Sequence, residues 1–254
     1  MTLHIKTTLF AAALAVGGIG SANAADLAAR PYTKAPAPLL QPVYDWSGFY
    51  VGADAGYGWG RDRHTDLIPG GGFWTNGGAQ SIKPTGAVYG GQIGYNWQLS
   101  SWVIGLEAQF NGTSLKRTDT SIFFPATDSL RAKVDFTTTV TGRVGYALNN
   151  WLPYIKGGYA GAQLKTVNFD TLGNSLNYSD WQSGFVVGAG LEYAVAGNWV
   201  VGVEYNYMDF GKQTFTVSNT PATLGTESFK DHLTISTVTG RISYKFGGPV
   251  VARY

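Results

Sequence analysis

The chain has no cysteine, only three histidines and only 13% charged residues. Without cysteine it has no disulfide, no thiolate nucleophile and no cysteine metal site. Beyond residue 24 it also lacks any apolar run approaching the roughly 20 residues that a membrane helix requires. If the chain crosses a membrane, it must do so as a closed sheet, because lipid offers no hydrogen bonds to open strand edges.

The N-terminus carries a targeting pattern. Lys6 precedes an apolar run over residues 9–19, which is followed by the small-residue triplet Ala22-Asn23-Ala24. This order is typical of a secretory signal peptide over residues 1–24. Its removal takes Lys6 and no acid from the 18 basic and 16 acidic side chains, so the exported chain is almost neutral. We therefore expect no nucleic-acid partner.

From Trp46 onward, apolar and polar side chains alternate. In residues 199–207, large apolar side chains alternate with Gly202, Glu204 and Asn206, which indicates a strand with one apolar face. Such segments recur with no helical pattern between them, over residues 46–59, 86–98, 101–115, 132–148, 151–165, 181–195, 198–212 and 230–246. The pattern predicts an all-β fold, an eight-stranded antiparallel up-and-down transmembrane β-barrel.

The connections alternate between long polar stretches and tight turns. The long stretches lie near 60–85, 116–131, 166–180 and 213–229, and the turns near Leu99-Ser100, Asn149-Asn150 and Gly197-Asn198. In such barrels long loops face outward and short turns face the periplasm, so we expect four long extracellular loops and periplasmic termini. Residues 25–45, which contain four prolines, are expected to form a periplasmic linker, residues 46–246 the barrel, and residues 247–254 a short periplasmic tail.

The two faces of the predicted strands differ in charge. The outward face carries no charge, whereas the inward face carries four acids and four bases, namely Asp54, Glu107, Glu192, Glu204, Arg143, Lys156, Arg241 and Lys245. A barrel of this size has room inside only for its own side chains, and buried charges must be paired. We expect ion pairs that close the interior. The alternative is a narrow water-filled pore lined by the same residues.

Aromatic and basic residues sort to the strand ends. A lower aromatic girdle is predicted from Trp46, Trp97, Trp102, Trp151 and Trp199, and an upper one from Tyr57, Trp59, Phe110, Tyr159, Trp181 and Tyr207. Bases near the outer loops are candidates for contacts with lipopolysaccharide phosphates, namely Lys83, Lys116, Arg117, Arg131, Lys133, Lys165, Lys212 and Lys230. The alternative is ordinary solvated loop charge, balanced by Asp62, Asp66, Asp119 and Asp128.

No catalytic, cofactor or metal motif is expected. His64 lies in the string Arg61-Asp62-Arg63-His64-Thr65-Asp66, and His232 lies near Asp231 and Ser236. Neither arrangement has the spacing of a metal loop or a hydrolytic triad. We expect a protein that is not an enzyme.

Several short motifs resemble a known family. They are Ala24-Ala25-Asp26-Leu27, the opening Trp46-Ser47-Gly48-Phe49-Tyr50-Val51-Gly52, the endings Gly94-Tyr95 and Gly145-Tyr146, and Tyr244-Lys245-Phe246. The chain resembles alphaproteobacterial small outer-membrane proteins of the RopB and Brucella surface-antigen type. The resemblance implies an OmpA-like monomeric barrel with roles in envelope integrity and surface exposure, and with porin activity often attributed by name. It also implies that the assembly machinery reads a terminal aromatic residue, either Phe246 or Tyr254.

Overall fold

The computed structural model describes residues 44–66, 79–120, 128–170, 175–218 and 226–247. Within them, no helix is long and apolar enough to cross a membrane. Ten strands are described: β1 (Gly48–Asp66), β2 (Ala79–Ile82), β3 (Thr85–Leu99), β4 (Trp102–Thr113), β5 (Lys116–Thr120), β6 (Asp128–Tyr146), β7 (Trp151–Asp170), β8 (Ser175–Ala196), β9 (Trp199–Ser218) and β10 (Thr226–Phe246).

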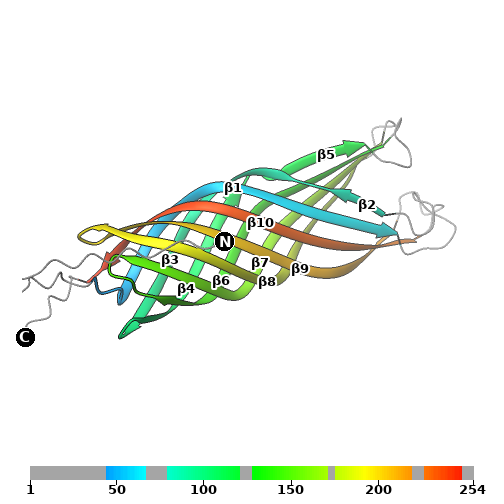
Figure 1. Ribbon diagram of the computed structural model, residues 1–254. Coiled ribbons are helices and arrows are strands. Elements are labelled where there is room, and N and C mark those ends of the chain that lie inside the picture. Colours follow the sequence, from blue (N-terminus) through cyan, green and yellow to red (C-terminus); the bar gives the residue numbers. More distant parts are fainter. Residues whose placement is uncertain (1–43, 67–78, 121–127, 171–174, 219–225, 248–254) are drawn as a thin grey trace, which may run out of the picture. The chain divides into compact units, whose positions relative to one another are not determined.

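The strands close into an antiparallel ring. β1 pairs with β10 on one side and with β3 on the other, and the remaining neighbours follow in chain order (Figure 1). β2 and β3 occupy one position in the wall, because Pro84 interrupts the ladder between them and cannot donate a hydrogen bond. β4 and β5 share another position and separate at Ser114 and Leu115. The ring therefore has the predicted eight positions.

One end of the ring consists of tight turns. Ser100, Asn149 and Gly197 adopt the left-handed backbone conformation there, with φ of 57°, 54° and 55°. These positions confirm the three predicted turns. We call this the turn end and the opposite end the loop end.

The predicted bounds of the long loops are wrong, because strands occupy much of the expected loop ranges. β1 continues to Asp66, β7 to Asp170 and β9 to Ser218, through ranges that we expected to be loops. The upper parts of these strands were taken for loops because their sequences are polar. A strand that rises above the membrane no longer needs apolar side chains on its outer face, so the signal used to recognise it disappears. Residues 67–78, 121–127, 171–174 and 219–225 lie outside the described residues.

The outer face of the wall is apolar between two aromatic girdles. Trp97, Trp102, Trp151 and Trp199 are exposed near the turn end, as predicted. Trp46 is only 1% exposed, so its assignment to the lower girdle is wrong. The segment that precedes β1 turns into the mouth of the barrel and carries the indole ring inside, where it packs with Leu152 and Val200.

The interior of the barrel has three layers. Next to the loop end lies an upper apolar layer, formed by Val88, Leu115, Val134, Ala160, Ala162, Leu164, Val186, Met208, Phe210, Leu233 and Ile235. Below it lies a polar region that includes the predicted inward charges other than Lys245. Next to the turn end lies a lower apolar layer of Trp46, Val103, Leu152, Ala194 and Val200. The upper apolar layer was not predicted.

The polarity of the two faces reverses along a single strand: inward side chains are polar in the lower part and apolar in the upper part. In β9 the lower part has Val203 exposed and Glu204 buried, whereas the upper part has Asp209 half-buried and Phe210 buried. In β6, Lys133 is exposed and Val134 is buried. The upper part of the wall thus resembles a water-soluble sheet, with apolar residues inside and polar residues outside.

Phe210→Ala should remove about 3–5 kcal/mol from the free energy of unfolding, because it leaves a cavity in the upper apolar layer. Phe185→Ala, on the outer face where the side chain is 51% exposed, should cost less than half as much, because lipid or detergent fills the space. Urea unfolding of the refolded protein, followed by tryptophan fluorescence, measures both values. Equal losses would show that the upper layer is not a packed core.

Candidate functional site

Six charged side chains meet in the polar region of the lumen. They come from six different strands: Glu107 from β4, Arg143 from β6, Lys156 from β7, Glu192 from β8, Glu204 from β9 and Arg241 from β10. Each is at most 5% exposed. Three acids face three bases, so the group, which we call the charged layer, is neutral as a whole.

Glu107 is the centre of the charged layer. Its carboxylate accepts hydrogen bonds from Arg143 Nη1 at 3.3 Å and Lys156 Nζ at 3.1 Å, and from the guanidinium of Arg241. It also accepts one from the hydroxyl of Tyr50 at 2.7 Å. One buried acid therefore contacts all three bases of the layer.

The other two acids complete the pairing. Arg143 donates to Glu192 with both terminal nitrogens, Nη2 to Oε2 at 2.7 Å and Nη1 to Oε1 at 3.2 Å. Lys156 Nζ donates to Glu204 Oε1 at 2.7 Å, and Arg241 also donates to Glu204. Arg241 Nε also lies 3.5 Å from Glu192 Oε1. Each acid is thus shared between at least two bases, which offsets the high cost of burying it.

Two tyrosines support the charged layer. Tyr50 donates to Glu107, and Tyr154 donates to Glu204 at 2.5 Å. The guanidinium of Arg143 also lies 3.9 Å from the ring centre of Tyr154, a cation–π geometry. A Cβ atom on Gly94 would lie 2.4 Å from the Tyr50 hydroxyl, and one on Gly190 would lie 2.4 Å from that of Tyr154. Glycine at these two positions lets both rings lie against the wall.

The remaining two predicted inward charges are buried but form no ion pair with the charged layer. Asp54 is 5% exposed and makes no ion pair among the residues that the structure describes. Lys245 donates to the backbone carbonyls of Asp45 and of Ser47, the latter at 3.1 Å. Lys245 therefore holds the segment that enters the mouth of the barrel, rather than joining the ion pairs.

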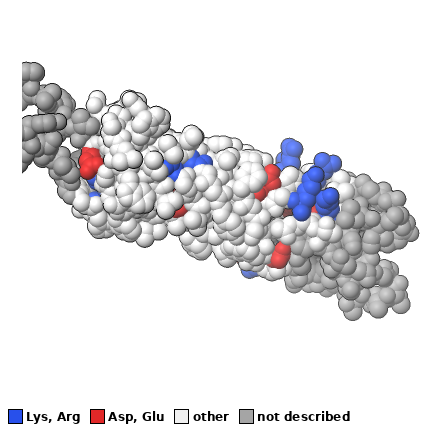
Figure 2. All heavy atoms as spheres, turned by 90° about the horizontal axis from the view of Figure 1, so that it is seen from below, with Lys and Arg blue, Asp and Glu red and all other residues white. Residues whose placement is uncertain are grey.

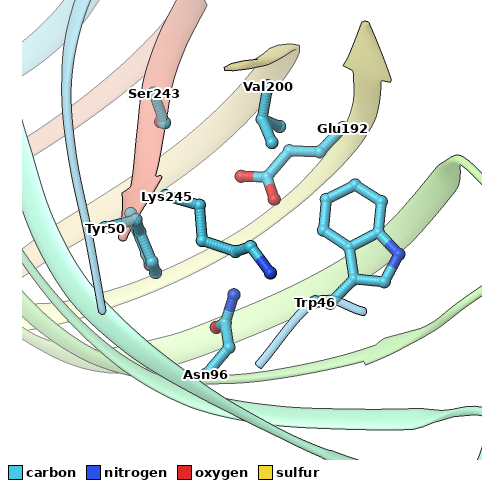
Figure 3. Close-up of a pocket in the computed structure, with 7 residues that line it drawn as sticks. All are labelled: Trp46, Tyr50, Asn96, Glu192, Val200, Ser243 and Lys245. Carbon is cyan, nitrogen blue, oxygen red and sulfur yellow. The ribbon is translucent and has the colours of Figure 1, made fainter. Parts of the chain in front are cut away.

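The entering segment lies inside the turn end of the lumen. The backbone N–H of Trp46 donates to Gln98 Oε1 at 2.7 Å, and its ring stands edge-on to that of Tyr44. Burial raises the pKa of the Tyr44 hydroxyl to about 12, so this group stays neutral in the mouth. A small pocket remains beside Trp46, into which Lys245 reaches between Glu192 and Asn96 (Figure 3).

The predicted basic contacts lie toward the loop end. Lys83, Lys116, Arg117, Arg131, Lys133, Lys165 and Lys212 are exposed there, and Lys230 is half-buried. Figure 2 shows Lys and Arg side chains gathered toward this end on one face. These basic residues differ in their ion pairing. Arg117 is paired with Asp119 at 2.8 Å, while Lys133 and Lys165 share Asp135.

The structure does not bring His232 and Ser236 together in one site. His232 Nε2 lies 3.0 Å from Asp209 Oδ1, whereas Ser236 Oγ lies 3.2 Å from the Tyr205 hydroxyl. The side chain of His64 lies outside the described ones. Among the residues that the structure describes, no group of three or more acids and histidines is arranged to hold a metal.

Sequence reasoning missed the uncharged members of the site. Tyr50 and Tyr154 occupy inward positions of β1 and β7, where an alternation count places them, but an aromatic residue in a barrel strand suggests a lipid contact. Gln109, which accepts from Lys156 at 3.3 Å, was missed because an inward amide is common in barrel lumens. Alternation could have identified all three. Tyr50, Tyr154 and Gln109 lie an even number of residues from Asp54, Lys156 and Glu107, respectively, and therefore share their inward face.

Comparison with known proteins agrees with this architecture. The protein-family model of the outer membrane protein beta-barrel domain matches residues 11–246. The 31 kDa outer-membrane immunogenic protein of Brucella melitensis is 34% identical over 205 residues, which cover 76% of this chain and 82% of that protein. The 25 kDa outer-membrane immunogenic protein of Brucella abortus is 29% identical over 95% of this chain and 99% of its own. The 22 kDa outer membrane protein of Rhizobium leguminosarum is 29% identical over 71% and 72%.

Glu107→Gln should lower the free energy of unfolding by about 3–5 kcal/mol, because it leaves one buried positive charge uncompensated. Adding Lys156→Met removes that excess while Arg143–Glu192 and Arg241–Glu204 remain paired. The double variant should therefore recover about 1–3 kcal/mol relative to Glu107→Gln alone. Urea titration of the three proteins tests this, and additive losses would mean that the charges do not act together.

Proposed function

We propose, since the chain belongs to the family of the outer membrane protein beta-barrel domain, that it is a closed barrel which reinforces the outer membrane and displays its loop end at the surface. Its location is the outer membrane, as for the relatives that it matches.

The observation that carries this proposal is the stacking of three layers in one lumen. An ion that passes through must leave water at the lower apolar layer, displace paired charges, and leave water again at the upper apolar layer. Moving an ion into an apolar medium costs tens of kcal/mol in the idealised limit. Ion pairs alone would leave a polar path, whereas apolar layers on both sides of them do not.

The charged layer also supports a mechanical role. Side chains from six strands meet within hydrogen-bonding distance at the centre of the barrel. Any change in the cross-section of the wall would separate these charges inside a medium of low dielectric constant, where their attraction is strongest. The barrel is therefore suited to resist lateral deformation of the membrane.

The alternative function is a small-solute or ion porin. Two observations favour it. Asn111 Oδ1, Thr139 Oγ1 and Thr239 Oγ1 are buried in the polar region without a hydrogen-bond partner among the described residues, and such atoms are sites for water. The lower apolar layer, moreover, is centred on Trp46, which belongs to the entering segment and not to the wall. Conduction would still require the upper layer to open.

Single-channel recording in planar bilayers separates the two functions. The refolded protein should give no steady conductance, and Trp46→Ala should also be silent because the upper apolar layer remains. Glu107→Gln/Lys156→Met serves as the variant with altered charge. Steady conductance of the wild-type protein, with an ion preference that changes in this variant, would establish the porin alternative instead.

A strain that lacks the protein tests the structural role. It should become more sensitive to detergents that attack the outer membrane, while its uptake of small hydrophilic solutes stays unchanged. Complementation with the wild-type chain should restore resistance. The opposite pattern, slower solute uptake with normal detergent resistance, would contradict a reinforcing role and agree with a porin.

A further inference from the structure

Three lysines form a row on the outer wall near the loop end. Lys116 of β5 pairs across strands with Lys133 of β6, which pairs with Lys165 of β7. All three side chains are exposed, and Val134 and Leu164, their neighbours in sequence, point into the lumen. We call these three residues the lysine row. Adjacent strands lie less than 5 Å apart, so three positive charges occupy a short arc of the wall.

One acid lies within the lysine row. The register of β6 and β7 shifts between Val134 and Phe136, and this bulge turns Asp135 toward the outer face. Its two oxygens lie 2.6 Å from Lys133 Nζ and 2.6 Å from Lys165 Nζ. Lys116 makes no ion pair with any residue that the structure describes. The row therefore keeps an excess of two positive charges, and Asp135 fixes two of its ammonium groups in place.

An aromatic surface lies on the membrane side of the lysine row. The rings of Phe110 and Phe136 have their centres 5.4 Å apart, and those of Phe136 and Trp181 are 5.8 Å apart. The indole N–H of Trp181 donates to the Tyr159 hydroxyl at 3.2 Å. Phe110 and Trp181 are exposed. Below them the wall is apolar, so apolar, aromatic and cationic zones follow one another along β6.

This order matches the boundary between acyl chains and an anionic headgroup. Aromatic rings favour the interface, and lysines just beyond it attract phosphates. Because the loop end of an outer-membrane barrel faces outward, the lipid concerned is that of the outer leaflet. The opposite wall offers a less favourable surface, since the corresponding row of Arg63, His232 and Lys212 has a histidine in place of a third lysine or arginine, and its acid Asp209 lies against that histidine.

We propose that the lysine row and the rings of Phe110, Phe136 and Trp181 form a docking site for one lipopolysaccharide molecule, with a lipid A phosphate against Lys116, Lys133 and Lys165. The site is a patch on β4 to β8 and not a continuous collar around the barrel. It does not depend on whether the lumen conducts.

Binding of lipid A to the folded barrel in detergent, measured by native mass spectrometry, tests the site. The wild-type protein should bind one molecule. The variant Lys116→Gln/Lys133→Gln/Lys165→Gln should bind roughly fivefold more weakly per lysine, on the order of a hundredfold in all. The control Arg61→Gln/Arg63→Gln/Lys212→Gln removes the same charge from the β9–β10–β1 wall and should keep most of the affinity. Faster migration of unheated protein in gels confirms that each variant is folded.

Asp135→Asn provides a gain-of-function test. It removes the acid within the lysine row and should tighten binding of lipid A roughly fivefold. Lipid A without phosphates and phosphatidylglycerol should bind weakly to all four proteins. Equal losses in the row variant and the control, or equal binding of lipid A with and without phosphates, would overturn the proposal. So would preferential binding of phosphatidylglycerol.

Discussion

Charge neutrality among buried ions is the constraint on which the rest of this structure depends. Six strands each contribute one ion to the charged layer, and Glu107 contacts all three of its bases. The two apolar layers on either side of these ions offer no polar group to solvate an unmatched one. Burial and pairing therefore depend on each other, because burial makes an unpaired charge costly and pairing makes the burial of these six ions tolerable.

The same constraint explains the residues around the ions. Tyr50 and Tyr154 add hydroxyl donors to the carboxylates of Glu107 and Glu204. Glycines opposite them make room for the rings in a narrow barrel. Lys245, close to the turn end, has no acid within the charged layer and binds backbone carbonyls of the entering segment instead. A surplus base thus ties the N-terminal side of the barrel to its final strand.

Much of this architecture follows from the sequence, and the exceptions have physical causes. Alternation located the eight wall positions, the three turns and the inward charges. It did not give their heights, which depend on the stagger between strands, so the partners of Glu107 emerged only from the structure. Trp46 was misplaced because an indole near a strand end fits the aromatic girdle at the membrane surface as well as the lumen. The outward position of Asp135 could not be predicted, because it depends on a bulge, and a bulge is defined by the pairing of two strands and not by the sequence of one.

The length of the strands places each of them in two environments. β8 has 22 residues and β10 has 21, whereas about 9–11 residues suffice to cross a membrane. The lower part of the wall is matched to hydrocarbon, and its energy varies with bilayer thickness. The upper part has an apolar interior and a wet exterior, so its stability carries the heat-capacity signature of a water-soluble domain. Changes of lipid and changes of temperature or cosolvent thus act on different halves of the same strands.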